Sequence, residues 1–391
     1  MRVSTPMDTR GLNSWIEISR DAYLHNVAFF RRLVGPRVEL AVVVKANAYG
    51  HGRRLVAELA AAGGADSFCV HSLDEALDLR AAGLAQDVLI MGHVPLARAA
   101  EAVAHDFRCG LFNLASAAAL AAAARDQGRR VRVHLKLETG TYRQGVDDDE
   151  LAAVLDFLRA HSEVRLEGAY THFANVEDTT DHAYAERQLR RFDELVERVR
   201  AAGFGEPRRH AACSAASLVV ARTHFDMVRL GVSQYGLWPS KETFLSYKLR
   251  HADTGEETLR PVLTWKTRIS QVKRVPAVRF VGYGCTYQTP RESLVAVLPI
   301  GYSDGYDRRL SNQAHVLVRG RRAPVRGRVC MNLTMVDVTD VPGVELEDEV
   351  VVIGRQGDQQ VRAEDLAALV GTISYEIVAR IHGDLPRLVV E

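Results

Sequence analysis

A lysine directly follows a short, strongly apolar run near the N-terminal end of the chain. The run covers residues 41–44 and the lysine is Lys45. A continuous apolar run of this kind is typical of a strand buried in a parallel sheet. The amine of Lys45 would then be carried on a rigid element, and a lysine in a dry site can lose its proton near neutral pH and attack a carbonyl carbon. The plainer interpretation is a strand-end lysine that only reaches water.

Polar residues also follow apolar runs farther along the chain. His172, Ser214 and Arg229 lie near the ends of three such runs, and Gly231 and Val232 follow the last of them. A serine hydroxyl together with the backbone amides around Gly231 and Val232 would suit a dianionic phosphate, because glycine allows close approach. Each residue also has a structural explanation, since a strand-end histidine is often a core residue and Ser214 could cap the next helix. If all of them share one end of a barrel, a phosphate site is the better interpretation.

The elements that must position these residues alternate regularly between residue 41 and about residue 236. Apolar runs begin at Ala41, Ser67, Asp87, Arg108, Val131, Arg165, Arg208 and Asp226. Helical patterns lie between them at Ser72–Ala82, Leu96–His105, Leu114–Arg125, Glu150–Arg159 and Tyr184–Ala202. Eight strand–helix units predict an α/β fold, a (β/α)8 TIM barrel of ~250 residues with its active site at the C-terminal strand ends. A doubly wound open sheet is the alternative architecture.

Several residues mark the ends of these helices. Ser72 and Asn113 are placed to cap two helices, and Gly83, Gly128 and Gly203 to end three.

The helical rhythm stops after about residue 255. Valine- and threonine-rich runs follow at Thr264–Val275, Leu294–Ile300, His315–Arg319, Arg326–Val338 and Glu349–Ile353. They predict a mainly antiparallel β domain with short helices at Ala363–Leu369 and Tyr375–Ile381. We therefore expect a barrel domain over residues 1–250 and a β domain over 251–391, with Lys241–Glu257 as the linker. The strand expected within residues 1–20 could pair with either domain.

Composition excludes several classes of function. The 391 residues are 47% hydrophobic and 25% charged, with a formal net charge of +1. This balance gives no electrostatic reason to expect nucleic acid or a membrane surface as partner. No apolar run approaches the ~20 residues that span a bilayer, and the N-terminus lacks a signal-peptide core. Five widely separated cysteines without CxxC pairs indicate neither a disulfide framework nor a metal site, so we expect a cytoplasmic protein.

The segment around Lys45 resembles a family signature. Residues 41–52 read Ala-Val-Val-Val-Lys-Ala-Asn-Ala-Tyr-Gly-His-Gly. They are similar to the motif in which alanine racemases hold pyridoxal 5'-phosphate as a Schiff base, and the resemblance spans essentially the whole chain. It implies that Lys45 carries the cofactor and is one of two catalytic bases.

The resemblance also implies roles for other residues of the barrel. Lys136 would be carbamylated and would orient Arg143, which contacts the cofactor phenolic oxygen and the substrate carboxylate. Arg229 would face the pyridine nitrogen, with His172 beside the ring. The phosphate would be held by Tyr49, Ser214, Gly231, Val232 and Tyr375.

In the C-terminal domain, Gly282-Tyr283-Gly284 resembles the motif of the second acid/base. Tyr302 and Met331 lie in segments similar to those that close the substrate pocket. In this family these segments come from the partner subunit, so the resemblance implies a homodimer with shared active sites.

The expected activity is a two-base interconversion of L- and D-alanine that supplies D-alanine for peptidoglycan. Cys213, Asn332 and the pair Thr141–Tyr142 depart from the usual family pattern and leave substrate breadth open. A broader racemase of the same fold, acting on serine, lysine or arginine, is therefore the alternative.

Three further classes of protein fit the sequence less well. A basic amino-acid decarboxylase of the same architecture would pair the ring nitrogen with an acid rather than with Arg229. A pyridoxal phosphate carrier would be a single barrel domain. A purely structural protein would have no reason to gather these strand-end residues.

Overall fold

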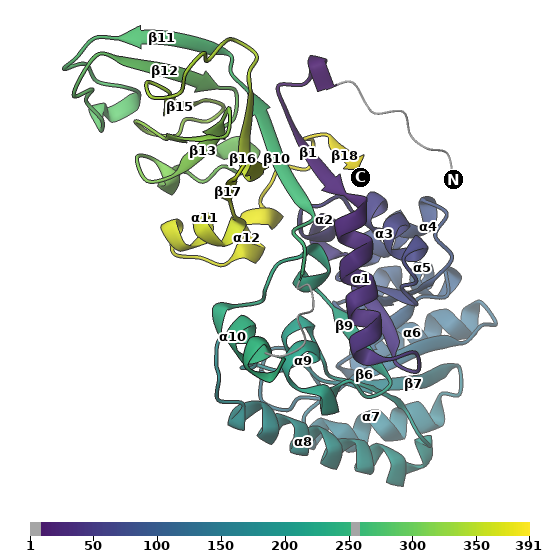
Figure 1. Ribbon diagram of the computed structural model, residues 1–391. Coiled ribbons are helices and arrows are strands. Elements are labelled where there is room, and N and C mark those ends of the chain that lie inside the picture. Colours follow the sequence, from purple (N-terminus) through teal and green to yellow (C-terminus); the bar gives the residue numbers. More distant parts are fainter. Residues whose placement is uncertain (1–8, 252–258) are drawn as a thin grey trace. The chain divides into compact units, whose positions relative to one another are not determined.

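The computed structural model describes residues 9–251 and 259–391 (Figure 1). Contacts divide the chain into two compact units. The barrel unit comprises Leu24–Ala46 and Arg53–Arg260. The β unit comprises the described residues before Leu24 together with Asn47–Gly52 and Pro261–Glu391.

Eight parallel strands form the centre of the barrel unit, in the order β8-β7-β6-β5-β4-β3-β2-β9. They are β2 (Glu39–Val43), β3 (Ser67–Val70), β4 (Asp87–Ile90), β5 (Arg108–Leu111), β6 (Val131–Lys136), β7 (Val164–Tyr170), β8 (Arg208–His210) and β9 (Met227–Leu230). Two backbone hydrogen bonds join the remaining edges, from Asp226 N to Arg209 O at 3.1 Å and from Arg229 N to Ala212 O at 3.0 Å. The sheet is therefore closed, and the predicted (β/α)8 barrel is confirmed over the open sheet.

Helices follow the barrel strands as the sequence predicts (Figure 1). They are α3 (Arg53–Ala62), α4 (Leu73–Ala81), α5 (Ala99–Ala104), α6 (Leu114–Asp126), α7 (Asp148–Ala160), α8 (Ala183–Val199), α9 (Ser214–Val219) and α10 (Lys241–Arg250). Ser72 caps α4 by accepting from Glu75 N, and Asn113 caps α6 by accepting from Ser116 N, as expected. α1 (Arg20–Val34) precedes β2 and runs from the β unit into the barrel unit.

The β unit is mainly antiparallel and contains two sheets. The larger has the order β14-β13-β16-β10-β1-β18, with β17 paired to β16, and the smaller has the order β11-β12-β15. The strands are β1 (Ser14–Ser19), β10 (Leu263–Arg268), β11 (Gln271–Val275), β12 (Ser293–Leu298), β13 (His315–Val318), β14 (Arg321–Pro324), β15 (Thr334–Asp337), β16 (Glu349–Gln356), β17 (Gln359–Val361) and β18 (Arg387–Val390). β1 lies between β10 and β18, so the early strand pairs within the β unit.

Two of the predicted strands are wrong in extent, and the expected linker contains a helix. The run Thr264–Val275 is broken at Ile269 and Ser270 into β10 and β11. Within Arg326–Val338 only β15 is a strand, because Gly327 takes φ +77° and residues 327–333 form a loop. The expected linker at Lys241–Glu257 begins with helix α10, which Ser240 caps by accepting from Thr243 N at 2.9 Å. The part of that linker over residues 252–257 lies outside the described residues.

α11 (Ala363–Val370) and α12 (Ser374–Ala379) agree with the two short helices expected near the C-terminus. Among the helices that the structure describes, none combines the length and apolar character that crossing a membrane requires.

Candidate active site

Lys45 begins a left-handed turn at the C-terminal end of β2. This turn is α2 (Lys45–Tyr49), in which four consecutive non-glycine residues, Ala46 to Tyr49, have φ between +51° and +54°. A left-handed conformation costs an L-residue roughly 1–2 kcal/mol. Such a run persists only where the surroundings impose it, and strain of this kind concentrates at functional sites.

Specific contacts hold this turn in place. The amide of Ala46 donates to Glu75 Oε1 at 2.7 Å. The imidazole of His51 donates from Nδ1 toward the carbonyl oxygens of Ala48 and Tyr49, at 3.1 and 3.0 Å. Gly50 has φ +85°, and a Cβ at this position would collide with the carbonyl oxygen of Val378 in α12. The strained segment is therefore fixed at both of its ends, and Lys45 starts from a defined backbone.

The amine of Lys45 lies in an environment that favours the neutral form. Burial lowers its pKa, and the positive charge of Arg143 lowers it further, whereas Glu75 acts in the opposite direction. The lowered pKa increases the fraction of free amine near neutral pH, which a carbonyl-attacking lysine requires.

Lys136 ends β6 and is 6% exposed. Burial, followed by Arg143 and Arg229, lowers its pKa to about 8. Its Nζ lies 5.9 Å from the ring centroid of Tyr170, and among the described residues no hydrogen bond or ion pair joins it to an acid. Glu138 near Lys136 and Glu75 near Lys45 balance only part of the positive charge at the barrel centre, which predicts an anionic ligand or modification there.

Arg229 in β9 is 4% exposed and donates mainly to backbone carbonyls. Nη2 donates to Thr171 O at 2.8 Å and to Ala211 O at 3.1 Å, and Nη1 donates to His210 O at 3.0 Å. Within the described chain no carboxylate contacts this guanidinium. A guanidinium keeps its proton in proteins, so Arg229 presents a fixed positive charge to whatever it faces.

His172 lies beside this guanidinium, with Nδ1 3.5 Å from Arg229 Nη2. Burial and then Arg229 lower the pKa of His172 to about 3. The imidazole is therefore neutral near pH 7 and can orient neighbouring groups without adding charge.

Ser214 does not cap α9, contrary to the structural explanation considered for it. Its hydroxyl accepts from Gly231 N at 2.9 Å and Ser233 N at 3.3 Å, across the turn that follows β9. Val232 begins the short η5 helix (Val232–Tyr235) in that turn. The Ser233 Oγ is buried and has no hydrogen-bond partner in the described structure. Hydroxyls and amides therefore gather where the sequence predicted a phosphate site.

The residues that depart from the family pattern carry no charge of their own. Burial and then Glu177 raise the pKa of Cys213 to about 11, so its thiol is neutral. The Thr141 hydroxyl donates to His172 O at 2.6 Å, and Asn332 Nδ2 donates to Ser303 Oγ at 2.7 Å. These side chains therefore make local hydrogen bonds and add no charge to the site.

The remaining predicted residues lie in the β unit and form two groups. Tyr49 and Tyr375 pack with ring centroids 6.1 Å apart. Tyr283, Tyr302 and Met331 line a cavity of about 420 Å³, with exposed fractions of 72%, 40% and 56%. Exposed large apolar side chains that gather at a cavity are typical of a surface that binds a ligand or another protein.

The structure therefore brings together Lys45, Lys136, Arg143, His172 and Arg229 electrostatically within the barrel unit. The sequence interpretation missed Glu75, Tyr170 and His210. His210 and Tyr170 are the last residues of β8 and β7, so their positions at strand ends could have identified them. Glu75 could not be found in this way, because its carboxylate reaches the Ala46 amide from a neighbouring helix.

Comparison with known proteins gives a consistent result over both units. The family descriptions "Alanine racemase, N-terminal domain" and "Alanine racemase, C-terminal domain" match residues 18–239 and 262–389. The chain is 42% identical over 389 residues to "Alanine racemase" of Desulfosudis oleivorans, covering 96% of each protein. It is 41% identical over 383 residues to that of Symbiobacterium thermophilum, covering 97% of this chain and 98% of the relative.

Solved structures agree with these matches. Alanine racemase from Streptomyces coelicolor A3(2) superposes with a TM-score of 0.90 at 34% identity, covering 98% of this chain and 99% of that one. The enzyme from Bacillus anthracis, solved with bound L-Ala-P, gives a TM-score of 0.89 at 33% identity, covering 97% and 95%. The sequence, the fold and these full-length similarities together establish that the chain belongs to the alanine racemase family.

Proposed function

We propose that this protein interconverts L-alanine and D-alanine with pyridoxal 5'-phosphate and supplies D-alanine for peptidoglycan. Support comes from the full-length family match combined with a half-buried Lys45 that lies at the end of a barrel strand and directly precedes a strained left-handed turn. The pKa of that lysine is shifted in the direction that cofactor attachment requires.

The residues present fit the cofactor. The unpartnered Ser233 hydroxyl and the Ser214 hydroxyl, which accepts from Gly231 N, offer donors for a phosphate, and the surplus of positive charge at Lys136 and Arg229 favours an anionic group. Tyr49, Tyr375 and Val232 complete the proposed phosphate site. When bound, the cofactor withdraws electrons from the substrate and makes the proton on Cα acidic.

The chain's own residues then move that proton. Lys45 exchanges it on the face of the D-isomer, and Tyr283 of the partner subunit exchanges it on the face of the L-isomer. A tyrosine has an unperturbed pKa of ~10, so positive charge beside it must lower that value for work near neutral pH. Arg143 binds the substrate carboxylate and Lys136, as its carbamate, orients Arg143.

Arg229 and His172 set the electrostatics beside the cofactor ring. The guanidinium of Arg229 is positively charged and only donates hydrogen bonds, so it cannot stabilise a proton on the ring nitrogen as a carboxylate would. Electron withdrawal is then weaker than with a carboxylate partner, which disfavours side reactions.

The shared site requires a homodimer in which Tyr283, Tyr302 and Met331 of one subunit close the pocket of the other. The exposure of these side chains in the single chain supports this arrangement.

The first test locates the cofactor. Borohydride reduction of the protein loaded with pyridoxal phosphate should fix the label on the peptide that contains Lys45. Lys45→Arg retains a positive charge but lacks the reactive amine, so it is the matched control and should remain unlabelled. A label on Lys136 instead would contradict the assignment.

The second test identifies the substrate. Solvent deuterium should enter Cα of both alanine enantiomers, with conversion of each into the other. Serine, lysine and arginine assayed in parallel distinguish the alanine enzyme from a broader racemase, because comparable turnover of these substrates would favour the broader activity.

A further inference from the structure

A continuous line of buried polar side chains leads from Arg229 through the interior of the barrel. Arg229 Nη1 lies 2.6 Å from His210 Nδ1, and His210 Nε2 lies 2.8 Å from His134 Nδ1. Both histidines are fully buried. Barrel interiors are usually filled by branched apolar side chains, so two hydrogen-bonded imidazoles on the inner strands require an explanation.

The chemistry of Arg229 fixes the proton positions along this line. A guanidinium only donates, so His210 must accept at Nδ1 and carry its proton on Nε2. His210 then donates to His134 Nδ1, which leaves the proton of His134 on Nε2. That Nε2 lies 3.8 Å from Glu167 Oε1, which is longer than a hydrogen bond, and it has no hydrogen-bond partner among the described residues, so Glu167 is the acid nearest along the line. The line therefore has a donor-only group at one end and an acceptor-only carboxylate at the other.

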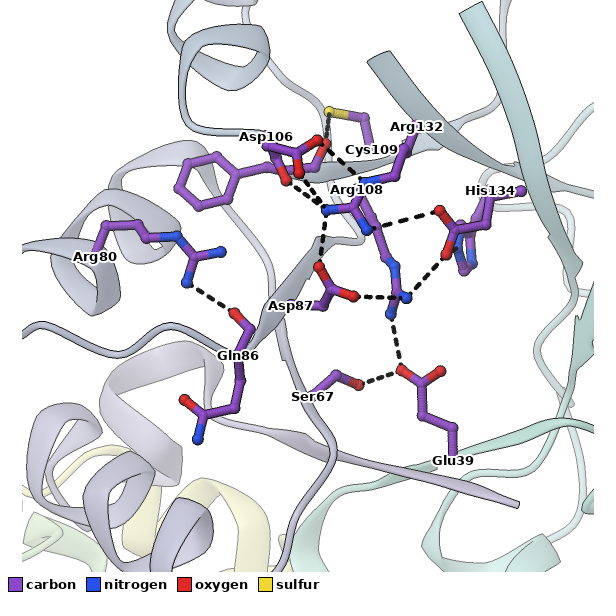
Figure 2. Close-up of polar contacts among 12 residues, drawn as sticks. Glu39, Ser67, Arg80, Gln86, Asp87, Asp106, Arg108, Cys109, Arg132 and His134 are labelled. Carbon is purple, nitrogen blue, oxygen red and sulfur yellow. Dashed lines mark hydrogen bonds and ion pairs between the residues drawn. The ribbon is translucent and has the colours of Figure 1, made fainter. Parts of the chain in front are cut away.

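Glu167 is itself anchored in an ionic cluster at the N-terminal end of the barrel. Arg108 contacts Glu167 Oε1 at 2.9 Å, Asp87 Oδ2 at 2.8 Å and Glu39 Oε1 at 2.8 Å. Figure 2 shows Arg108 between Glu39 and Asp87, with His134 beside the cluster. Although burial alone would raise the pKa of Glu167, His134 and Arg108 bring it down to about 2, so the carboxylate stays ionised.

Tyr170 fixes the plane of the middle imidazole. Its ring stacks on His210 with centroids 4.7 Å apart and an interplanar angle of 3°, and the Arg229 guanidinium lies 5.4 Å from the same ring. His210 therefore cannot rotate freely to offer Arg229 a different edge.

We propose that Glu167 and His134 are positioning residues that act through His210 to orient Arg229. The Glu167 carboxylate is the negative charge at the far end of this line of side chains. This inference rests on the proposed function, because Arg229 is the residue expected to face the cofactor ring nitrogen. The imidazoles of His210 and His134 are neutral. Each points its lone pair toward Arg229 and its N–H toward Glu167, so the position of Glu167 determines the orientation of both rings. The N-terminal end of the barrel then contributes to the reaction at the opposite end.

The first experiment reads the proton positions directly in the holoenzyme. Protein labelled with ¹⁵N-histidine should show His134 and His210 each with an unprotonated Nδ1 and a protonated Nε2. The variants His134→Asn and His210→Asn identify the two signals by their loss. A proton on Nδ1 of either residue, or a doubly protonated imidazole, would overturn the proposal. This reading needs no substrate turnover, so it stands even if alanine is not the substrate.

The second experiment compares two substitutions that remove the same charge from the same cluster. Glu167→Gln removes the acid that His134 faces, whereas Asp87→Asn removes an acid that contacts Arg108 and Arg132 but not His134. Glu167→Gln should lower kcat for alanine by about 3- to 30-fold, as remote network substitutions do, with KM unchanged. It should also weaken the preference of His134 for a protonated Nε2, while Asp87→Asn changes neither quantity.

Equal losses in both variants, or no change in Glu167→Gln, would show that the cluster only stabilises the barrel. If Glu167→Gln does not fold, the imidazole signals of the unsubstituted enzyme decide the question.

Discussion

The charge state of Lys136 determines how the cationic centre of the barrel is balanced. Carbon dioxide reacts with the free amine, forming an N–C bond and releasing one proton to leave a carbamate anion. A pKa of about 8, lowered first by burial, makes roughly a tenth of the amine available at pH 7, far more than an ordinary lysine offers. The nearby guanidinium groups would then stabilise the anion.

We therefore expect protein prepared in ¹³C-bicarbonate to show a carbamate carbon signal that Lys136→Ala lacks. An ammonium at this position would instead repel Arg143, by ~1 kcal/mol in water at 4 Å and more at lower dielectric. Lys136→Ala should lose racemase activity and recover part of it with acetate or chloride. Full activity in Lys136→Ala, without added anion, would mean that the side chain has no part in placing Arg143.

At the residue scale the sequence is informative where a side chain follows a recognisable strand. The apolar runs alone place Lys45, Ser214 and Arg229 at strand ends. They do not predict the contacts of Ser214, because the amides that it accepts from lie seventeen and nineteen positions later in the chain. The partners of His210 are hidden for the same reason, since they come from strands β6 and β9.

At the element scale the most unexpected feature is the handedness of α2. The glycines at positions 50 and 52 indicate a turn, but local propensity disfavours a left-handed conformation at four non-glycine residues. Only contacts from distant segments impose it, including the close approach of Gly50 to α12. The barrel strands are well predicted because they are buried on both faces, and burial requires apolar residues that are visible as continuous runs in the sequence.

Substitution of Gly50 tests how far this turn depends on packing. Gly83 has a similar φ of +78°, but no atom lies within 4 Å of the position that a Cβ would occupy there. Gly83→Ala should therefore lower the free energy of unfolding only by the backbone strain, roughly 1–2 kcal/mol. Gly50→Ala should cost about 1–3 kcal/mol more, because its Cβ would collide with the Val378 carbonyl oxygen.

Denaturant unfolding compares the two alanine variants, and borohydride labelling of Lys45 reports the state of the turn. Labelling should fall in Gly50→Ala and remain normal in Gly83→Ala. Equal stability of the two variants would indicate that α12 yields readily and that packing does not hold α2.

At the scale of the whole molecule, the proposed dimer makes a quantitative prediction about mixed subunits. Lys45→Ala and Tyr283→Phe should each be inactive, because every site lacks one of its two bases. In an equal mixture half of the dimers combine one subunit of each kind, and each such dimer has one intact site of two. Activity should therefore recover to about one quarter of the unsubstituted level.

Differently tagged subunits establish that exchange has taken place, and each variant incubated alone is the control. Exchange without recovery would place both bases of a site in one chain, contrary to the shared-site arrangement.

The pairing of β1 has a consequence for the order in which the chain folds. Its neighbours are β10 and β18, so Ile16 lies opposite Trp265 on one side and Arg387 on the other. During synthesis this strand leaves the ribosome well before either partner, because β10 begins at Leu263 and β18 only at Arg387. The side chains of Trp15, Ile16 and Ile18, which are fully buried in the folded protein, must therefore stay unpaired until β10 has been made, and one edge of β1 stays open until β18 follows. Unpaired apolar strands are prone to aggregate, so the newborn protein should depend on chaperones until β18 emerges.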